Sequence, residues 1–479
     1  MIVRAMSATK RAVHGVRRVA VIATVAAVGL GLSGTGAQEN RRTTTLYVSP
    51  HGSDSARGTA RAPLRTPQAA VDRLGRSGGT VRLAGGKYAR QRIVIKGRSH
   101  ITVRAATGAA PVLDGTGLEP AAGRSGMVEI RDSSDVTVSG LTITGYRTTS
   151  LSAVPIGIFV TGSGHSVRLS GNHIHHLGND NGTLGSFDLN AHGIAVYGTD
   201  ATRPISGVGI TGNELDHLVL GASETLVLNG NVDGWAVTHN VIHDNNNIGI
   251  DAIGFEPTIS GKARFTDVNR ARNGLIADNL VSRIISEGNP AYWEDGSWCN
   301  CADGIYVDGG AAITIANNRV DASDIGIEVA SEWRQGRTNA IRIRNNVVTR
   351  SRYTGLAIGG YDQDRGEAYD VTVTGNLLRG NNTLNDGSPE MLLQYYVHDT
   401  TITRNTVIAT NAQPVLLYRD EPAGSAARNA RVVLDHNTYA GRVPAGRELY
   451  FWNGAEQRGL ARYQAVSGQD RSSTYTWRR

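Results

Sequence analysis

The sequence predicts an all-β fold, a right-handed parallel β-helix in which each coil is built from three short strands. An asparagine recurs just before a short apolar stretch, and each interval contains stretches of alternating apolar and polar residues rich in Val, Ile and Thr. No helical periodicity intervenes, which argues against a repeat of alternating strands and helices. The recurring residues are Asn172, Asn213, Asn240, Asn279, Asn318, Asn346, Asn376, Asn405 and Asn437.

The spacing of these asparagines is typical of a solenoid with insertions. The intervals are 41, 27, 39, 39, 28, 30, 29 and 32 residues, a base period near 28 to 30 with three longer gaps. Inward Val, Ile and Leu would form a continuous core. We expect each asparagine to lie in a turn, where its amide bonds backbone groups or the asparagine of the next coil.

The two ends of the chain carry different patterns, as capping of a solenoid requires. Residues 66–74 have an N-cap Thr, a Pro in the first turn and the apolar spacing of a short helix, which we expect to plug the N-terminal end. After about residue 440 an aromatic segment around Tyr450 and Tyr463 replaces the repeat and would cover the other end. We predict a β-helix over residues 44–440 and a C-terminal capping segment over residues 441–479.

The first residues indicate export. Basic residues precede an apolar run over residues 19–32, and small residues end at Ala37. This pattern predicts a signal peptide over residues 1–37 and a secreted, extracellular protein. The run is too short and too rich in Ala and Gly for a membrane anchor, so we expect no stable membrane insertion. Arg17 and Arg18 leave the Sec and twin-arginine routes both open.

The charge of the chain argues against nucleic acid as a partner. The formal net charge is +7, but the predicted leader holds five basic residues and no acidic ones, which leaves +2 for the exported part. Because a solenoid grows by addition, that part can form one long domain. We expect it to be a monomer.

Two local clusters have structural interpretations. Cys299 and Cys301, the only cysteines, either close a small loop or remain reduced, and no further zinc ligands are obvious nearby. His173, His175 and His176 suggest a metal site, but alternation puts the first two beside a turn, where we expect a solvated surface instead.

Several segments resemble known secreted β-helix proteins. Residues 46–54 (LYVSPHGSD) and 78–88 (GGTVRLAGGKY) resemble the entry segment that pectate-lyase-like and chondroitinase-B-like polysaccharide enzymes share. The middle is similar to an uncharacterised bacterial branch of such proteins at residues 249–251, 302–308, 326–328 and 359–362. The resemblance covers about residues 46–475 and implies the fold. This fold hosts lyases, hydrolases, epimerases and adhesins, so the function must be argued from the site.

One strand carries a candidate site in successive coils. Its Gly-Ile or Gly-Leu pair recurs in residues 192–196, 248–252, 303–308, 325–329 and 354–358. If the residue after each Gly points inward, the next residue points outward. The outward row then contains Asp251, Tyr306 and Glu328. Asp308 lies two residues further along the same face, Glu256 and Glu332 follow on the turns, and Asp303 precedes its strand.

The spacing of these carboxyls suits a hydrolase. Asp251 and Glu328, two coils apart, would be separated by about 10 Å, and Asp308 by about 8 Å from either. Inverting glycosidases separate their two carboxyls by about 6.5 to 9.5 Å; one stays protonated and the other activates water. The candidate catalytic residues are Asp251, Asp303, Asp308, Glu328 and Glu332.

The three longer gaps predict walls around this row. The extra residues fall at 179–190, 257–273 and 287–301, all bordering the acidic strand. They carry aromatic rings able to stack on sugars, including Phe187 and Tyr292. The candidate substrate-binding residues are His192, Tyr306, Trp293, Trp298, Arg334, Tyr361 and Glu390.

Three functions stay open at this point. The leading prediction is a glycoside hydrolase that degrades an extracellular polysaccharide with paired carboxylates. The first alternative is a polysaccharide lyase or uronate epimerase; the resemblance implies a basic residue near the abstracted proton and Ca²⁺ on the uronate, but no Lys lies on the acidic row. The second is a non-catalytic carbohydrate-binding surface protein. The hydrolase requires no cofactor, so Ca²⁺ is the one cofactor under consideration, and the sequence assigns no metal ligands.

Overall fold

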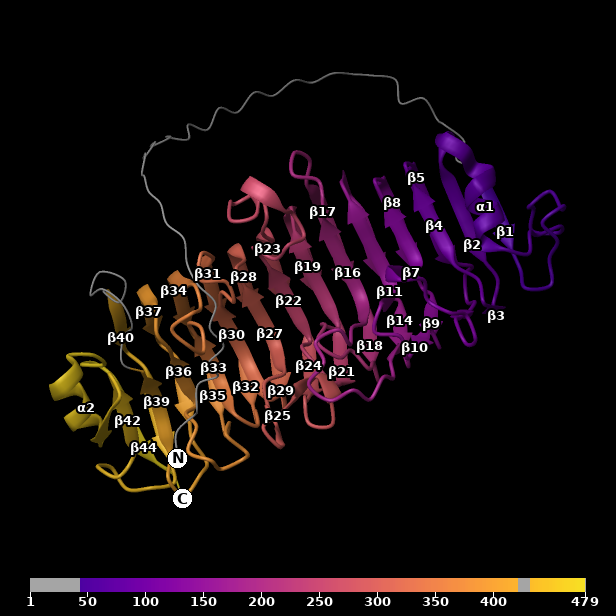
Figure 1. Cartoon of the computed structure of the whole chain (residues 1–479). Coiled ribbons are helices and arrows are strands. Elements are labelled where there is room, and N and C mark those ends of the chain that lie inside the picture. Colours follow the sequence, from indigo (N-terminus) through magenta and orange to yellow (C-terminus); the bar gives the residue numbers. More distant parts are fainter. Residues whose placement is uncertain (1–43, 421–430, 479) are drawn as a thin grey trace. The chain divides into compact units, whose positions relative to one another are not determined.

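Coils of three strands stack along the chain to form a parallel β-helix, which confirms the predicted fold class. The structure is a computed structural model that describes residues 44–420 and 431–478. The predicted signal peptide over residues 1–37 lies outside these ranges. Within them, the strands form three long sheets, and the chain passes from sheet 1 to sheet 2 to sheet 3 in each coil (Figure 1).

Sheet 1 contains β1 (Thr45–Val48), β2 (Gly79–Leu83), β5 (Ser99–Ala105), β8 (Ser134–Ser139), β12 (Gly164–His165), β13 (Val167–Ser170), β17 (Ile205–Thr211), β20 (Val232–Thr238), β23 (Arg272–Ala277), β28 (Ala311–Ala316), β31 (Arg337–Arg344), β34 (Glu367–Thr374), β37 (Val397–Thr403) and β40 (Val432–Asp435). Sheet 2 contains β3 (Gly86–Ala89), β6 (Pro111–Asp114), β9 (Thr142–Thr144), β14 (His173–His175), β18 (Glu214–Asp216), β21 (Val241–Asn245), β24 (Leu280–Ile284), β29 (Arg319–Asp321), β32 (Val347–Thr349), β35 (Leu377–Arg379), β38 (Thr406–Ile408), β41 (Thr438–Gly441) and β44 (Thr474–Trp477).

Sheet 3, which carries the predicted acidic row, contains β4 (Ile93–Lys96), β7 (Gly123–Arg131), β11 (Ala153–Gly162), β16 (His192–Gly198), β19 (Leu226–Gly230), β22 (Ile250–Ile253), β27 (Asp303–Asp308), β30 (Ile325–Ala330), β33 (Thr354–Ile358), β36 (Met391–Leu393), β39 (Val415–Arg419), β42 (Leu449–Trp452) and β43 (Ala455–Arg458). Two short pairs lie outside the three long sheets, β10 (Arg147–Thr148) with β15 (Gly178–Asn179) and β25 (Trp293–Glu294) with β26 (Ser297–Trp298). The helical elements are α1 (Pro67–Leu74), α2 (Leu460–Ser467) and the 3₁₀ turns Gly75–Ser77, Gly261–Ala263 and Pro290–Tyr292. Among the described residues, no helix is long and apolar enough to cross a membrane.

The recurring asparagines form a continuous ladder at the corner between sheet 1 and sheet 2. All nine are buried, and each of the first eight donates from its backbone N–H and its Nδ2 to the Oδ1 of the next asparagine. For Asn318 these distances to Asn346 Oδ1 are 2.9 and 3.0 Å. The ladder satisfies polar groups at a dry corner, which confirms the structural role expected from the sequence.

Close packing explains the Gly of the Gly-Ile pairs. A Cβ on Gly304 would lie 2.4 Å from Val320 Cγ1, and one on Gly326 would lie 2.3 Å from Val348 Cγ1. Only Gly fits where sheet 3 approaches sheet 2 this closely. The following Ile305 and Ile327 are buried in the main core, so the residues after them must face outward.

Both ends of the coil stack are capped. Thr66 accepts a hydrogen bond from Ala69 N–H (3.2 Å) and α1 buries Val71 and Leu74 in the core, as predicted for the capping helix. At the other end Tyr450 stacks on Tyr463 with 4.7 Å between ring centroids, which forms the expected aromatic cap. The caps lie at opposite ends of the stack (Figure 1).

The last coil extends further than the sequence suggested. Strands β42 and β44 still pair in parallel with sheets 3 and 2, so the repeat does not end near residue 440. The ladder ends on other groups: Asn437 donates from its backbone N–H to Ser473 Oγ (2.8 Å) and from Nδ2 to Asp470 Oδ1 (3.0 Å). The aromatic residues hid this coil because it lacks both the asparagine and the Val/Ile alternation.

Candidate functional site

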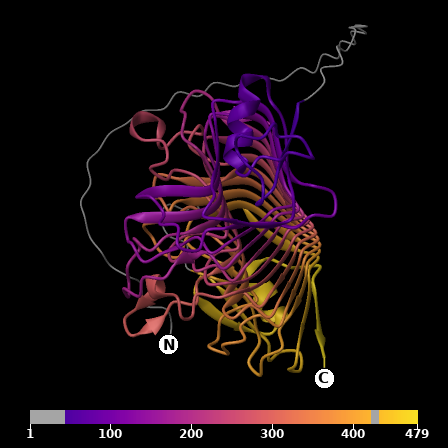
Figure 2. The same cartoon turned by 90° about the vertical axis from the view of Figure 1, so that its right-hand side faces the viewer.

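The outward row of sheet 3 forms as the sequence predicts. Asp251 is the register partner of Tyr306, and Tyr306 is the partner of Glu328. One strand therefore separates Asp251 from Glu328, which agrees with the expected spacing of about 10 Å. Figure 2 shows the loops of the coils gathered beside the sheets when the stack is turned by 90°.

The row is more deeply buried than an open groove would be. Asp251 is 2% exposed, Asp303 and Asp308 are each 3% exposed, and Glu328 is 6% exposed. Together with Glu224, which is 9% exposed, we call these five residues the carboxyl cluster. All five lie on or beside strands β19, β22, β27 and β30.

Two members of the carboxyl cluster share a hydrogen bond. Asp303 and Glu328 are linked side chain to side chain, which requires a proton between the two carboxyls. Burial raises the pKa of Glu328 to about 8, and the charge of Glu332 adds to the rise. Burial, followed by the charges of Glu328 and Asp251, holds the pKa of Asp303 well above its usual range. The pair therefore retains a proton at neutral pH.

The pKa values of the remaining members are raised as well. Burial is the main cause of the raised pKa of Asp251, and the charges of Glu224 and Asp308 add to it. Burial likewise raises the pKa of Asp308 and brings that of Glu224 to about 8. The Oδ1 atoms of Asp251 and Asp303 are buried without a hydrogen-bond partner among the described residues.

Glu332 joins the cluster to two tyrosines. Its carboxyl accepts from Tyr306 Oη (3.2 Å) and Tyr361 Oη (2.7 Å), and Arg365 Nη1 lies 3.2 Å from Oε2. Its backbone N–H donates to Asp308 Oδ1 (2.6 Å). This network positions one end of the row and connects the predicted catalytic Glu332 with the predicted binding residues Tyr306 and Tyr361.

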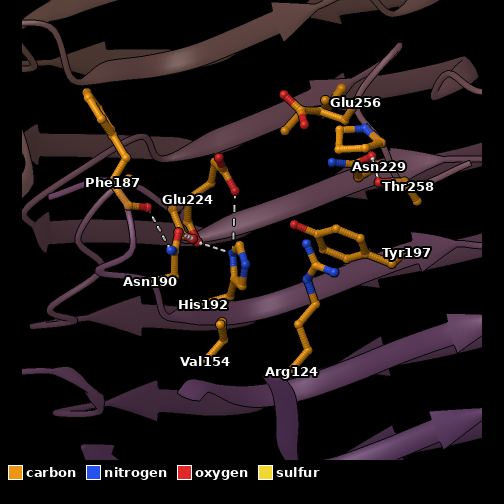
Figure 3. A pocket seen from close by; sticks show the side chains of 14 residues that line it. Arg124, Val154, Phe187, Asn190, His192, Tyr197, Glu224, Asn229, Glu256 and Thr258 are labelled. Carbon is orange, nitrogen blue, oxygen red and sulfur yellow. Dashed lines mark hydrogen bonds and ion pairs between the residues drawn. The ribbon is translucent and has the colours of Figure 1, made fainter. Parts of the chain in front are cut away.

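A pocket of about 510 Å³ opens beside the other end of the row, over strands β16 and β19 (Figure 3). His192 and Glu224 face each other in it, with 3.4 Å between His192 Nδ1 and Glu224 Oε2. Arg124 stacks over the Tyr197 ring at 4.2 Å. Burial, with a contribution from Arg124, lowers the pKa of His192 to about 3, so the imidazole is neutral. The further lining residues include Phe187, Asn190, Asn229, Ile253, Glu256 and Thr258.

Sequence reasoning missed three residues of this pocket: Glu224, Arg124 and Tyr197. Glu224 lies two residues before Leu226, the register partner of Ile194, and so corresponds to His192 in the preceding coil. It escaped notice because its coil reads Glu-Thr-Leu instead of Xaa-Gly-Ile. The asparagine ladder supplies the signal, since the interval from Asn213 to Asn240 must contain one strand of sheet 3.

Four predicted binding residues lie elsewhere. Trp293 and Trp298 pack on each other in the β25–β26 hairpin with 4.7 Å between centroids, and neither lines the pocket. Arg334 pairs with Asp364 at 2.7 Å. Glu390 is 1% exposed, and both carboxyl oxygens accept hydrogen bonds from Asn381, from its backbone N–H (3.0 Å) and from its Nδ2 (2.6 Å).

The position of Glu390 corrects its prediction as a substrate ligand. It aligns with the inward Gly of the Gly-Ile pairs, since the N–H of Gly355 donates to its carbonyl. It therefore points into the corner between sheets. Cys299 and Cys301 form a disulfide within the third insertion, the loop-closing alternative of the two left open.

Comparison with known proteins agrees with this architecture. A family model of the right handed beta helix region matches residues 297–456. The chain is 35% identical over 434 residues to the uncharacterized protein YwoF of Bacillus subtilis (strain 168), covering 90% of this chain and 87% of that protein.

Two solved structures are similar at low identity. The GH136 lacto-N-biosidase from Eubacterium ramulus matches 90% of this chain and 67% of its own, with 14% identity and a TM-score of 0.50. The A-module of the mannuronan C-5 epimerase AlgE6 from Azotobacter vinelandii matches 85% of this chain and 92% of its own, with 15% identity and a TM-score of 0.49. At 14% identity the likeness to the lacto-N-biosidase concerns the fold alone and leaves the reaction open. The extent of the match to YwoF decides the family: this chain is a right-handed β-helix protein of the family that includes YwoF.

Proposed function

We propose that the chain is a secreted enzyme that hydrolyses an extracellular polysaccharide, with the carboxyl cluster as its active site. The observation that carries this proposal is the hydrogen-bonded pair Asp303–Glu328, which holds a proton at neutral pH beside further carboxyls. Buried carboxyls with strongly raised pKa values are costly to a fold and are typical of acid–base sites.

The chemistry follows from two separated carboxyl groups. The Asp303–Glu328 pair donates its proton to the glycosidic oxygen as the bond to the anomeric carbon breaks. Water attacks that carbon, and Asp251, about 10 Å from Glu328 along the row, accepts the proton of the water. Such a separation leaves room for water on the far face of the sugar, as in inverting hydrolases. The cluster titrates as a unit, so one member is ionised while its neighbours keep their protons.

The pocket supports a second candidate, a lyase or epimerase acting on uronic acids. Arg124 is a cation among mostly acidic side chains and can pair with a uronate carboxylate. The neutral His192 beside it can accept the proton next to that carboxylate. In this case the carboxyls of the row would bind Ca²⁺ bridging to the uronate, provided that they lose their protons.

An activity screen distinguishes the two. The exported part of the chain would be incubated with neutral and uronate-containing polysaccharides, with Ca²⁺ or with chelator, while reducing ends and the ultraviolet absorbance of unsaturated uronates are followed. Proton NMR of the product would detect epimerisation, which changes neither signal. We expect new reducing ends without that absorbance, lost in Glu328→Gln and kept in His192→Gln.

Glu390→Gln is the matched control, because burial raises the pKa of Glu390 to about 8 as it does for Glu328, yet Glu390 faces the corner of the coil. Calcium-dependent absorbance or epimerised product lost in His192→Gln would establish the second candidate instead. Absence of turnover on every substrate, with binding retained, would favour a non-catalytic carbohydrate-binding protein.

A further inference from the structure

Sheet 2 gathers five of the chain's thirteen histidines on or directly after three neighbouring strands, on a different sheet from the carboxyl cluster of sheet 3. His175 is the partner of Asp216, and Asp216 is the partner of His243. We call the following residues the histidine cluster: His173, His175, His176, Glu214, Asp216, His217 and His243. The sequence alone predicted a solvated surface for the first three histidines. Their partners lie in neighbouring coils, which are 27 to 41 residues apart in the sequence, and so could not be recognised from it.

Asp216 is the centre of the histidine cluster. It is 6% exposed, with Oδ1 2.6 Å from His173 Nε2 and Oδ2 2.5 Å from His217 Nδ1. The Asp216 carboxylate therefore lies between two imidazoles, one on each oxygen. One ligand atom from each of His176, Asp216 and His217 can be chosen so that all three lie within 4.8 Å of one another.

Other acids on this sheet are paired differently. Asp321 is bound by Arg350, and Asp244 is bound by Arg283 as well as by its neighbour His243. A guanidinium neutralises a carboxylate but has no lone pair with which to bind a metal. An imidazole can pair with a carboxylate when protonated and can bind a metal when neutral. Asp216 is more buried than Asp244, and its partners are the imidazoles of His173 and His217 where Asp321 and Asp244 have an arginine.

The backbone does not explain the histidines. His176 and His217 occupy the turn after their strands with φ of 51° and 53°. The same turn in later coils accepts Arg283, Ala322 and Arg350 at φ between 53° and 56°. Because other side chains adopt this left-handed conformation at the same position, the backbone geometry does not require a histidine there.

Crowding favours neutral imidazoles. The Nδ1 atoms of His175 and His176 face each other at 2.8 Å, so at most one of the two can carry a proton there. Neutral imidazole is the form that binds transition metals, and carboxylate with imidazole suits zinc-type ions better than Ca²⁺ or Mg²⁺.

We propose that His176, Asp216 and His217 bind one divalent transition-metal ion of the zinc type. The ion replaces the proton between His217 Nδ1 and Asp216 Oδ2. His173 then orients the carboxylate through Oδ1, as outer hydrogen bonds do in metal sites. The rings of His176 and His217 are stacked at 4.9 Å and must turn toward the ion, which their exposure permits. The ion would join the coils of β14 and β18 without taking part in the reaction on sheet 3.

Metal titration of the whole chain tests this site. Protein freed of metal with chelator would be titrated with Zn²⁺ by calorimetry and with Co²⁺ by visible absorption, and its melting temperature would be recorded with and without Zn²⁺. We expect one Zn²⁺ per chain, a higher melting temperature with Zn²⁺ and no competition from Ca²⁺. The double variant His176→Gln/His217→Gln should lose both the bound Zn²⁺ and the rise in melting temperature, and His173→Gln should weaken binding about 10- to 100-fold.

His436→Gln is the matched control, since His436 is exposed and lies 3.3 Å from Asp435 in a distant coil; it should bind Zn²⁺ as the wild type does. Equal binding by wild type and double variant would overturn the site and indicate scattered surface imidazoles. Loss of binding in Glu214→Gln, with retention in the double variant, would also overturn it in favour of His173, Glu214 and Asp216. These readouts need no enzymatic activity, so they stand apart from the proposed function.

Discussion

Two stretches of sheet 3 use the same outward row for opposite chemistry. Over β22, β27 and β30 the row reads Asp251, Tyr306, Glu328. On either side its register partners are Phe159, Ala195 and Val227 before it and Ala357 and Leu392 after it. Both stretches are dry, since Val227 and Ala357 are fully buried and Asp251 is 2% exposed.

The contrast shows that backbone register does not select the chemistry. The same strand spacing accepts either apolar side chains or carboxyls. Apolar residues at these positions stabilise the fold, whereas buried carboxyls reduce its stability. We infer that the acidic stretch is retained for its chemistry, and three predictions test that difference.

The largest effect should be on catalysis. Asp251→Asn should lower kcat about 10²- to 10⁴-fold, because the amide cannot accept a proton from water. Leu392→Met, a shape-conserving change in the apolar stretch, should leave kcat unchanged. Steady-state kinetics on the substrate found by screening measure both. Equal losses in the two variants would break the comparison, since the row would then act only through packing.

The next effect concerns the ladder, which runs through both stretches. Asn318→Ala and Asn405→Ala should each lower the free energy of unfolding by about 3 kcal/mol. Each substitution leaves buried donors and acceptors of the neighbouring coils without a hydrogen-bond partner. Chemical denaturation measures the change, with the exposed Thr401→Ala as the control. Unequal costs would mean that the scaffold itself differs between the acidic and apolar stretches.

The smallest effect should be on stability against pH. The pKa of Glu328 in the folded chain, about 8, exceeds its ordinary value of 4.5, so the folded state binds more protons and stability falls as pH rises through this window. Glu328→Gln removes that loss. The variant should be more stable than wild type by about 2 kcal/mol at pH near 6 and equal to it at pH near 4.

Denaturation at several pH values tests the sign. A Gln that destabilises at high pH would show that the Glu328 carboxylate is favoured by partners, contrary to the dry site described here. Glu390→Gln should gain less, because Asn381 donates to both oxygens of Glu390 and an amide supplies only one acceptor.

The repeat made most of the fold predictable. The asparagine spacing and the Gly-Ile pairs fix which strands stack, and alternation then places Asp251, Tyr306 and Glu328 in one row. The hydrogen bond between Asp303 and Glu328 could not be predicted from the sequence, because it depends on side-chain conformations across neighbouring strands. Glu224 was missed because its coil lacks the Gly-Ile pair.

Insertions were the other limit of prediction. Their positions follow from the long intervals between asparagines, but their internal packing has no period. Trp293 and Trp298 therefore turned out to contact each other, and Arg124 enters the pocket from a coil before the ladder begins. The last coil was hidden for a related reason, since Asp470 and Ser473 satisfy its corner in place of an asparagine.

That substitution at the last coil has a consequence for assembly. Each asparagine of the ladder presents the next coil with the same hydrogen-bonding groups as the asparagine before it. Nothing in the repeat itself therefore sets the number of coils. Asp470 and Ser473 close the row with groups that cannot offer the same pattern to a following coil. They end the ladder: because its final rung is chemically different, the amide pattern that each coil passes to the next stops at this coil.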